Sequence, residues 1–276
     1  MRKLLAVLAL GVCAVGFHDV SAQAQTAPEV TLTRMSDCGT SQAPTDVALR
    51  FTDTYAYNGV KIQFVFSCYL VKHGDEYMMW DTGHSMTAPG GVAPKVSLVD
   101  QLAQLKVTPD QIKFVGISHF HADHTGQVAS FPKATLLIGK GDWNGITSNP
   151  PMQGANVAPF ANWISGGGKV EPLPLDKDVF GDGTVVMLAT PGHTPGHHSL
   201  LVRLKDTGPV VLSGDFVHFR ENYDSDGVPS FNFNRAETVA SIERVKKIAA
   251  NLKAMVIIQH DQRDIGKLPA FPTAAK

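Results

Sequence analysis

The chain carries at positions 118–124 the run Ser118-His119-Phe120-His121-Ala122-Asp123-His124. This run follows the apolar residues 114–117, which predict a buried strand, so we expect it on the loop at the carboxyl end of that strand. Imidazole and carboxylate groups are ligands that suit zinc, and iron, manganese and cobalt stay open as alternatives. His119 and His121 are two residues apart, so in extended backbone their side chains point to the same side and can bind one ion. Asp123 and His124 follow a bend and can face a second ion.

Further metal-type residues follow predicted strands elsewhere in the chain. They are His193 after residues 185–189, Asp215 after residues 210–213 and His260 after residues 255–258. In layered α/β folds, sites collect at the carboxyl ends of strands, because the loops there converge while the strands hold them rigid. The sequence therefore predicts one composite site built from several strand ends.

The remaining pattern alternates strands and helices, which places the chain in the α/β class. Apolar residues at helical spacing predict a helix over 96–106. Asn234, with Glu237 three residues later, predicts the capped start of another helix. The predicted strands are 63–71 and 76–81 around a hairpin turn at 73–75, and 111–118, 134–138, 185–189, 210–213 and 255–258.

The first 24 residues have the features of a secretory signal peptide. Arg2 and Lys3 precede an apolar run over 4–17, and the small-x-small triplet 22–24 offers a cleavage site. The apolar run is short for a membrane span, although an uncleaved anchor is left open. We therefore predict a single domain over 25–276, periplasmic or secreted, with no stable membrane insertion.

Charge argues against nucleic acid as a partner. The chain has 24 basic and 25 acidic residues, and residues 1–24 contain two basic and one acidic residue. Removing them leaves 22 basic and 24 acidic residues, a net charge of −2. A protein that binds nucleic acid or an anionic membrane normally carries an excess of positive charge, which this chain lacks.

Two cysteines remain once Cys13 leaves with the signal peptide. Cys38 and Cys68 would then stand in an oxidising compartment, where a disulfide is allowed. The sequence gives no distance between them, so a disulfide and two buried thiols are both open.

The predicted site resembles the signature of the metallo-β-lactamase superfamily over about residues 60–263. The matching positions are the His-x-His-x-Asp-His run at 119–124, His193 within the run Thr190-Pro191-Gly192-His193-Thr194-Pro195-Gly196-His197, Asp215 as the bridging aspartate, and His260 as the last histidine. Asp81, in Trp80-Asp81-Thr82-Gly83, matches the early aspartate that supports the site from behind.

This resemblance implies a fold and a set of cofactors. The implied fold is an αββα sandwich, with two mixed β-sheets flanked by helices. The implied cofactors are two Zn²⁺ ions, one held by His119, His121 and His193, the other by Asp123, His124 and His260, with Asp215 and a hydroxide between them.

Within the superfamily the chain most resembles the quorum-quenching N-acyl homoserine lactonases. Ser67-Cys68-Tyr69-Leu70 resembles their opening hairpin, and the run over 190–200 resembles their second motif. The implied reaction is opening of the lactone ring by a metal-bridging hydroxide, with Asp123 orienting the nucleophile and shuttling its proton. A tyrosine of these lactonases, three residues after the bridging aspartate, is replaced by His218, which either keeps a role at the oxyanion or marks another substrate.

The acyl chain of such a substrate needs an apolar groove. Large side chains in three loops are candidates for its walls, or else are lids of the core: Met86, Trp143, Phe160, Trp163, Phe216, Phe219 and Tyr223.

Several alternatives are left open. A phosphotriesterase or arylesterase of the same fold would use the same ligands on a small-molecule ester. A β-lactamase fits less well, because some types need a cysteine where Asp215 stands and the others have no bridging aspartate. Outside enzymes, the alternative is a periplasmic metal or small-ligand binder. A homodimer is also left open.

Overall fold

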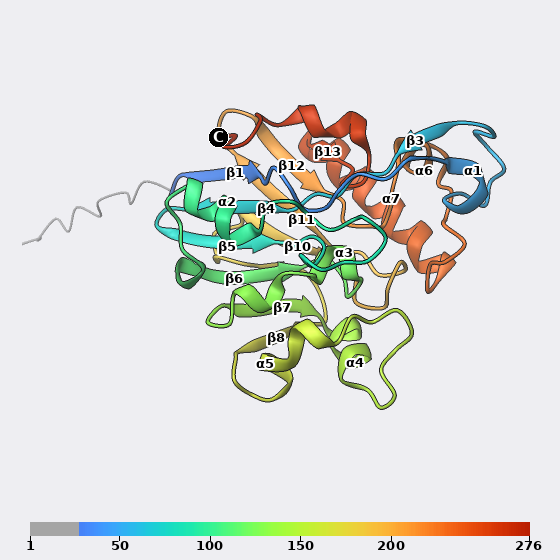
Figure 1. Cartoon of the computed structure of the whole chain (residues 1–276). Coiled ribbons are helices and arrows are strands. Elements are labelled where there is room, and N and C mark those ends of the chain that lie inside the picture. Colours follow the sequence, from blue (N-terminus) through green and yellow to red (C-terminus); the bar gives the residue numbers. More distant parts are fainter. Residues whose placement is uncertain (1–27) are drawn as a thin grey trace, which may run out of the picture.

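The computed structural model describes residues 28–276, and the predicted signal peptide at residues 1–24 lies outside the described part. Two β-sheets stack face to face between outer helices (Figure 1). The first sheet is mixed, since β1, β4 and β5 pair antiparallel whereas β5 to β8 pair parallel. Its six strands, in spatial order, are β1 (Val30–Arg34), β4 (Tyr69–His73), β5 (Glu76–Trp80), β6 (Ile112–Ile117), β7 (Thr135–Gly139) and β8 (Val170–Leu173).

The second sheet has five strands and is also mixed, because only β12 and β13 pair parallel. Its strands, in spatial order, are β13 (Met255–Ile257), β12 (Gly208–Leu212), β11 (His198–Leu204), β10 (Val185–Ala189) and β9 (Lys177–Asp178). A separate two-stranded sheet pairs β2 (Pro44–Asp46) with β3 (Lys61–Gln63).

Alternation of side chains along the strands builds the core. Tyr69 and Val71 of β4 face the second sheet, where they join a buried cluster with Met187 and Leu200. Leu70, between them in sequence, belongs to a cluster on the opposite face of the first sheet. Each central strand is therefore apolar on both faces, which is the condition for a four-layer sandwich.

Helices cover the two outer faces. On the first sheet Leu98 and Leu102 of α2 pack into the outer cluster, and on the second sheet Ile242 and Val245 of α7 do so. The α-helices are α1 (Val47–Arg50), α2 (Leu98–Gln104), α3 (Ala122–Thr125), α4 (Lys140–Thr147), α5 (Ala161–Ile164), α6 (Arg220–Ser225) and α7 (Arg235–Leu252). Short 3₁₀ helices span Pro109–Gln111, Val128–Ser130, Ala158–Phe160 and Gln262–Lys267. No helix within 28–276 combines the length and the apolar character that crossing a bilayer requires.

Most predicted elements are found within two residues of their expected ends. The side chain of Asn234 caps α7 by accepting a hydrogen bond from the backbone N–H of Glu237 at 3.2 Å. The strand predicted over 63–71 is shorter, because β3 ends at Gln63 and β4 begins only at Tyr69. The residues between leave the sheet and run beside the loop of His260, whose carbonyl oxygen accepts a hydrogen bond from the backbone N–H of Val65 at 3.2 Å.

The two remaining cysteines form a disulfide. Cys38 and Cys68 are joined with their Cα atoms 5.9 Å apart, and both side chains are buried. The bond ties the segment after β1 to the start of β4, so of the two alternatives left by the sequence the structure shows the disulfide.

Candidate metal centre

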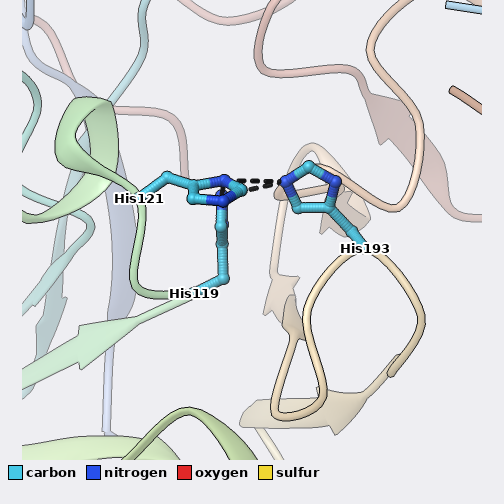
Figure 2. Close-up of side chains that lie close together, drawn as sticks. All are labelled: His119, His121 and His193. Carbon is cyan, nitrogen blue, oxygen red and sulfur yellow. Dashed lines mark hydrogen bonds between the residues drawn. The ribbon is translucent and has the colours of Figure 1, made fainter. Parts of the chain in front are cut away.

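Three histidines converge at the carboxyl ends of β6 and β10 (Figure 2). His119 and His121 lie between β6 and α3, and His193 lies between β10 and β11. Nε2 of His119 lies 2.8 Å from Nδ1 of His121 and 3.1 Å from Nε2 of His193. The third side of the triangle, from His121 Nδ1 to His193 Nε2, measures 3.0 Å. Three nitrogens at these separations form one face of a tetrahedral site, the geometry that zinc prefers.

A second group lies next to the first. Asp123 and His124 belong to α3, and His260 follows β13. Nε2 of His124 lies 3.2 Å from Nε2 of His260, and Oδ2 of Asp123 lies 3.7 Å and 3.6 Å from these two nitrogens. Together with Asp215 these residues place four ligand atoms close enough to hold an ion.

Asp215 lies between the two groups and gives one oxygen to each. Its Oδ2 is 3.5 Å from Nε2 of His193 and 3.7 Å from Nε2 of His119. Its Oδ1 is 2.9 Å from Nε2 of His260 and 3.2 Å from Nε2 of His124. Oδ1 nevertheless has no hydrogen-bond partner within 28–276 although it is buried. Buried carboxylate oxygens normally have a partner, and the ring nitrogens around this one do not donate to it. A cation would supply the missing partner.

The outer nitrogens of two ligand histidines, His193 and His260, are held by oxygens that can only accept. Nδ1 of His260 donates to the carbonyl oxygen of Val65 at 2.7 Å, and Nδ1 of His193 to Oδ1 of Asn232 at 2.9 Å. In these two rings the proton therefore stays on Nδ1, and the lone pair of Nε2 points into the site. This is the arrangement that metal-ligating histidines require.

The electrostatics of the site favour added positive charge. Burial lowers the pKa of His124, but Asp215, Asp81 and Asp123 together raise it well above its ordinary value. Burial also lowers the pKa of His193 to well below its ordinary value, so that this ring is neutral and free to ligate. The residues present thus fit a pair of divalent cations, with the carboxylates concentrated on the side of His124.

A match to a family model over most of the chain assigns this protein to a family. A family model described as the metallo-beta-lactamase superfamily matches residues 65–260. The chain belongs to the metallo-beta-lactamase superfamily. The His/Asp cluster is the dinuclear metal site of this superfamily.

Relatives within the superfamily include lactonases. The N-acyl homoserine lactonase AttM of Rhizobium radiobacter is 28% identical over 235 residues, which cover 74% of this chain and 84% of that protein. An N-acyl homoserine lactone hydrolase, solved with the product N-hexanoyl-L-homoserine at its catalytic metal center, matches at a TM-score of 0.69 and 22% identity, over 91% of this chain and 100% of that one. AidC, a dizinc quorum-quenching lactonase solved with a product, matches at a TM-score of 0.63 and 18% identity, over 91% of each chain.

These comparisons bear on three predictions. The αββα sandwich is confirmed, and so is the resemblance to the N-acyl homoserine lactonases. The enzyme class, a metal-dependent hydrolase of the metallo-beta-lactamase superfamily, is also confirmed.

Asp81 lies directly behind the second ligand group, at the end of β5. Its Oδ1 accepts a hydrogen bond from the backbone N–H of Ser118 at 2.7 Å. Its Oδ2 faces Nδ1 of His124 at 2.9 Å and also accepts from Nε2 of Gln259 at 2.9 Å. Asp81 therefore both orients a ligand ring and anchors the start of the histidine-rich loop.

Gln259 is a supporting residue that the sequence did not reveal. Its Oε1 accepts hydrogen bonds from Nε1 of Trp80 at 2.9 Å and from the backbone N–H of Gly214 at 2.8 Å. Because its amide also donates to Asp81, one buried side chain connects the ends of β5, β12 and β13. The only signal in the sequence is its position next to His260.

Asp142, in the first turn of α4, joins the two loops that carry the three-histidine group. Its carboxylate accepts hydrogen bonds from the backbone N–H of Phe120 at 3.1 Å, the hydroxyl of Thr194 at 2.8 Å and the backbone N–H of Gly196 at 2.6 Å. Burial raises the pKa of Asp142 to about 7, and these hydrogen bonds act in the opposite direction. The sequence did not single it out, although Asp142 follows a predicted strand as the ligands do.

A cavity of about 830 Å³ opens onto the metal ligands. Asp123, Asp215 and two of the ligand histidines line it, and six phenylalanine side chains supply apolar wall. These aromatic residues are Phe51, Phe64, Phe66, Phe120, Phe231 and Phe233. Arg50 stands at the rim, with its guanidinium 4.9 Å from the ring centroid of Phe231.

The residues predicted for the walls of the groove are not the ones that line this cavity. Phe160, Trp163, Phe216 and Phe219 are buried in the core clusters, which agrees with the second alternative left open for them, that of lids of the core. The physical reason is that burying a large aromatic ring in the core contributes about 1.5–3 kcal/mol, which competes with any role at the surface.

The other three predicted wall residues also lie away from the cavity. Trp143 packs from α4 against the outer cluster of the first sheet, and Met86 is exposed. Tyr223 packs beside α7, between the cations of Arg220 and Lys246, so it does not line the cavity either.

His218 does line the cavity. Its Nε2 lies 3.1 Å from Oδ2 of Asp215, and its ring centroid lies 5.2 Å from that of His193. Its Nδ1 is buried and has no hydrogen-bond partner in the described part of the chain. Burial lowers the pKa of His218, which keeps the ring neutral.

Proposed function

We propose that this protein is an exported dinuclear metal hydrolase that opens the lactone ring of N-acyl homoserine lactones. The observation that carries the proposal is the convergence of seven ligands beside an aromatic-walled cavity. The relative AttM is named an N-acyl homoserine lactonase, and one structural neighbour holds an acyl homoserine product at its catalytic metal center. We propose two Zn²⁺ ions as the native pair, which the dizinc site named for AidC supports.

The cavity suits a substrate with a polar head and an apolar tail. Its volume of about 830 Å³ lies in the range of small-molecule sites. The ligand residues offer the only concentrated charge at its base, whereas Phe51, Phe64 and Phe231 supply apolar wall. A lactone ring at the ligands with its acyl chain along the phenyl rings satisfies both regions.

When bound, two cations in this site polarise a carbonyl group and lower the pKa of a shared water molecule towards neutrality. His119, His121 and His193 would hold one cation, with Asp215 between the two. Asp123, His124 and His260 would hold the other. The chain's own residues then determine how the substrate and the proton are placed.

Asp123 and His218 have the positions for these tasks. The carboxylate of Asp123 is 20% exposed, against 4% for Asp215, so Asp123 is the carboxylate that reaches water in the cavity. It orients the attacking water and passes its proton to the leaving ring oxygen. His218 lines the cavity with Nε2 3.1 Å from Oδ2 of Asp215, so its neutral ring carries the proton on Nε2, and this N–H would assist the carbonyl oxygen as negative charge develops there.

A substrate panel on zinc-loaded protein tests the proposal. The panel comprises an N-acyl homoserine lactone, an aryl phosphotriester, an aryl ester and nitrocefin. We expect turnover of the lactone to be fastest, with one added water on the product by mass spectrometry. Asp215→Ala should lose both turnover and metal, whereas His73→Gln, at the far end of β4, should lose neither.

Other outcomes would overturn the proposal. Faster turnover of the phosphotriester or of the aryl ester would assign the site to that class of substrate. Two metals per chain without turnover of any ester would indicate a binding protein.

Export is a separate part of the proposal. It rests on the signal-type sequence over 1–24 and on the Cys38–Cys68 disulfide, since such bonds persist in oxidising compartments. Cell fractionation should place the protein outside the cytoplasm. Its mass should be that of a mature chain that begins at Gln25. A full-length chain in the cytoplasmic fraction would contradict it.

A further inference from the structure

His84 is a cavity residue that neither the ligand set nor the proposed roles account for. Its Nε2 is buried and has no hydrogen-bond partner within 28–276. Three of the four such side-chain atoms in the described residues belong to cavity residues: Asp215 Oδ1, His218 Nδ1 and His84 Nε2. The first lies between the two ligand groups, and the second belongs to a ring that already has a proposed role at the carbonyl oxygen. A third unpaired polar atom at the same cavity calls for a partner of its own, because buried polar groups are normally hydrogen-bonded.

The ring of His84 is held in place from several sides. Its backbone N–H donates to the carbonyl oxygen of Cys38 at 2.8 Å, and its carbonyl oxygen accepts from Nε2 of Gln127 at 3.1 Å. The ring packs edge-on against Phe66, with centroids 4.3 Å apart. The disulfide of Cys38 and the core position of Phe66 make this a rigid support, so the unpaired nitrogen has a defined position.

The surroundings place His84 in the half of the site that holds Asp123 and His260. Phe66, which carries the ring of His84, also packs edge-on against His260 at 5.7 Å. Burial lowers the pKa of His84, and the charge of Asp123 acts in the opposite direction. His218 borders both halves, with its ring 5.2 Å from that of His193 and 5.6 Å from that of His260. The two imidazoles therefore reach the site through different contacts, His84 through Phe66 and His218 through these two ligand rings.

We infer that His84 is a further catalytic residue, which donates a hydrogen bond from Nε2 to the leaving ring oxygen of the lactone. This inference rests on the proposed function. In the reaction, a water oxygen bonds to the carbonyl carbon and the bond from that carbon to the ring oxygen breaks. The proton released by the water reaches the ring oxygen through Asp123, and His84 contributes no proton of its own. The donor matters because the alkoxide that leaves is strongly basic and is therefore a poor leaving group without assistance.

A pair of substrates that differ in one atom tests the inference. In an N-acyl homocysteine thiolactone the leaving atom is a thiolate, whose pKa is about 8.5 and which needs little help to depart. His84→Ala should lower kcat on the oxygen lactone by about 100-fold, the lower end of the range for losing one hydrogen-bond donor to a developing anion. On the thiolactone the same variant should keep nearly all of its kcat. His84→Gln, whose amide can donate in place of Nε2, should recover part of the loss.

Controls separate this role from packing and from metal binding. His73→Gln, a histidine change away from the cavity, should leave the ratio of the two kcat values unchanged. Metal content and thermal unfolding of each variant show whether the site is intact, and His84→Gln serves if His84→Ala does not fold. An equal loss on both substrates, or no loss on either, would overturn the inference.

Failure of the proposed function would look different. Wild-type protein would then turn over neither the lactone nor the thiolactone but would hydrolyse another ester. The same variants, tested on the oxygen and sulfur forms of that ester, would still decide whether His84 serves the leaving atom.

Discussion

The backbone N–H of Asp215 donates a 2.7 Å hydrogen bond to Nε2 of His197. Nδ1 of the same ring donates to the carbonyl oxygen of Thr190 at 3.0 Å. Burial lowers the pKa of His197 to about 3, which keeps the ring neutral and Nε2 free to accept. Gly214 precedes Asp215 with φ +58°, and a Cβ there would lie 2.5 Å from Nε2 of His197. Glycine at 214 therefore allows His197 to set the position of Asp215.

Replacing His197 should weaken metal binding without touching a ligand. His197→Phe removes the acceptor and leaves the buried N–H of Asp215 unpaired, so we expect a loss of roughly 10–100-fold in metal affinity. His197→Gln keeps an acceptor and should lose less. Competition with a chromogenic chelator measures both. Unchanged affinity in the Phe variant would show that Asp215 is held by other contacts.

Asp142 should make the stability depend on pH in a defined direction. Its pKa is raised to about 7, from an ordinary value near 3.8, so the native state keeps a proton that the unfolded chain has already released. The free energy of unfolding that this group contributes is therefore fully present below about pH 4 and is lost as the pH rises through 7. Urea unfolding of metal-free protein across this window should show the decline, and Asp142→Asn should remove it. An identical slope in the variant would exclude Asp142 as its source.

The disulfide should contribute several kcal/mol of stability. It joins residues 30 apart in sequence, and closing a loop of that length contributes roughly 3–4 kcal/mol through the entropy of the unfolded chain. The double variant Cys38→Ser with Cys68→Ser should therefore unfold at a lower urea concentration. Wild-type protein whose disulfide has been reduced by dithiothreitol in the unfolded state should unfold at a urea concentration lowered by a similar amount. The same reductant should leave the unfolding of the variant unchanged. A shift of the variant by the reductant would contradict this account.

Phe231 should control how activity depends on acyl chain length. Each buried methylene contributes about 0.8 kcal/mol, or roughly fourfold in kcat/KM. Phe231→Ala removes a wall beside His218 and His193, so the rise in kcat/KM from short to long chains should flatten. Phe233→Ala is the matched control, because that ring also lines the cavity but is 59% exposed. An equal loss on every chain length in the Phe231 variant would place its effect at the lactone ring instead.

The ligands could be predicted because they obey local rules. Four of them lie within six residues of one another, and the spacing of two along extended backbone brings His119 and His121 to the same side. His193, Asp215 and His260 are far apart in sequence, yet each follows a strand, and strand ends meet at one edge of a layered fold.

The cavity walls could not be predicted in this way. Phe51 follows α1, and Figure 1 shows that α1 and β3 lie beside α6. The side chain of Asn222 in α6 donates to the carbonyl oxygen of Phe51, a contact that spans most of the chain. No periodicity distinguishes Phe51, which lines the cavity, from Phe219, which is buried in the core.

The sequence by itself determined the layers and the ligand set, because apolar alternation and strand-end positions act over a few neighbouring residues. The tertiary structure alone decided which aromatic rings face the cavity and which polar groups hold the ligand loops together. Asp142, Gln259 and His197 act only through partners brought near by folding, and such pairing leaves no spacing to detect along the chain.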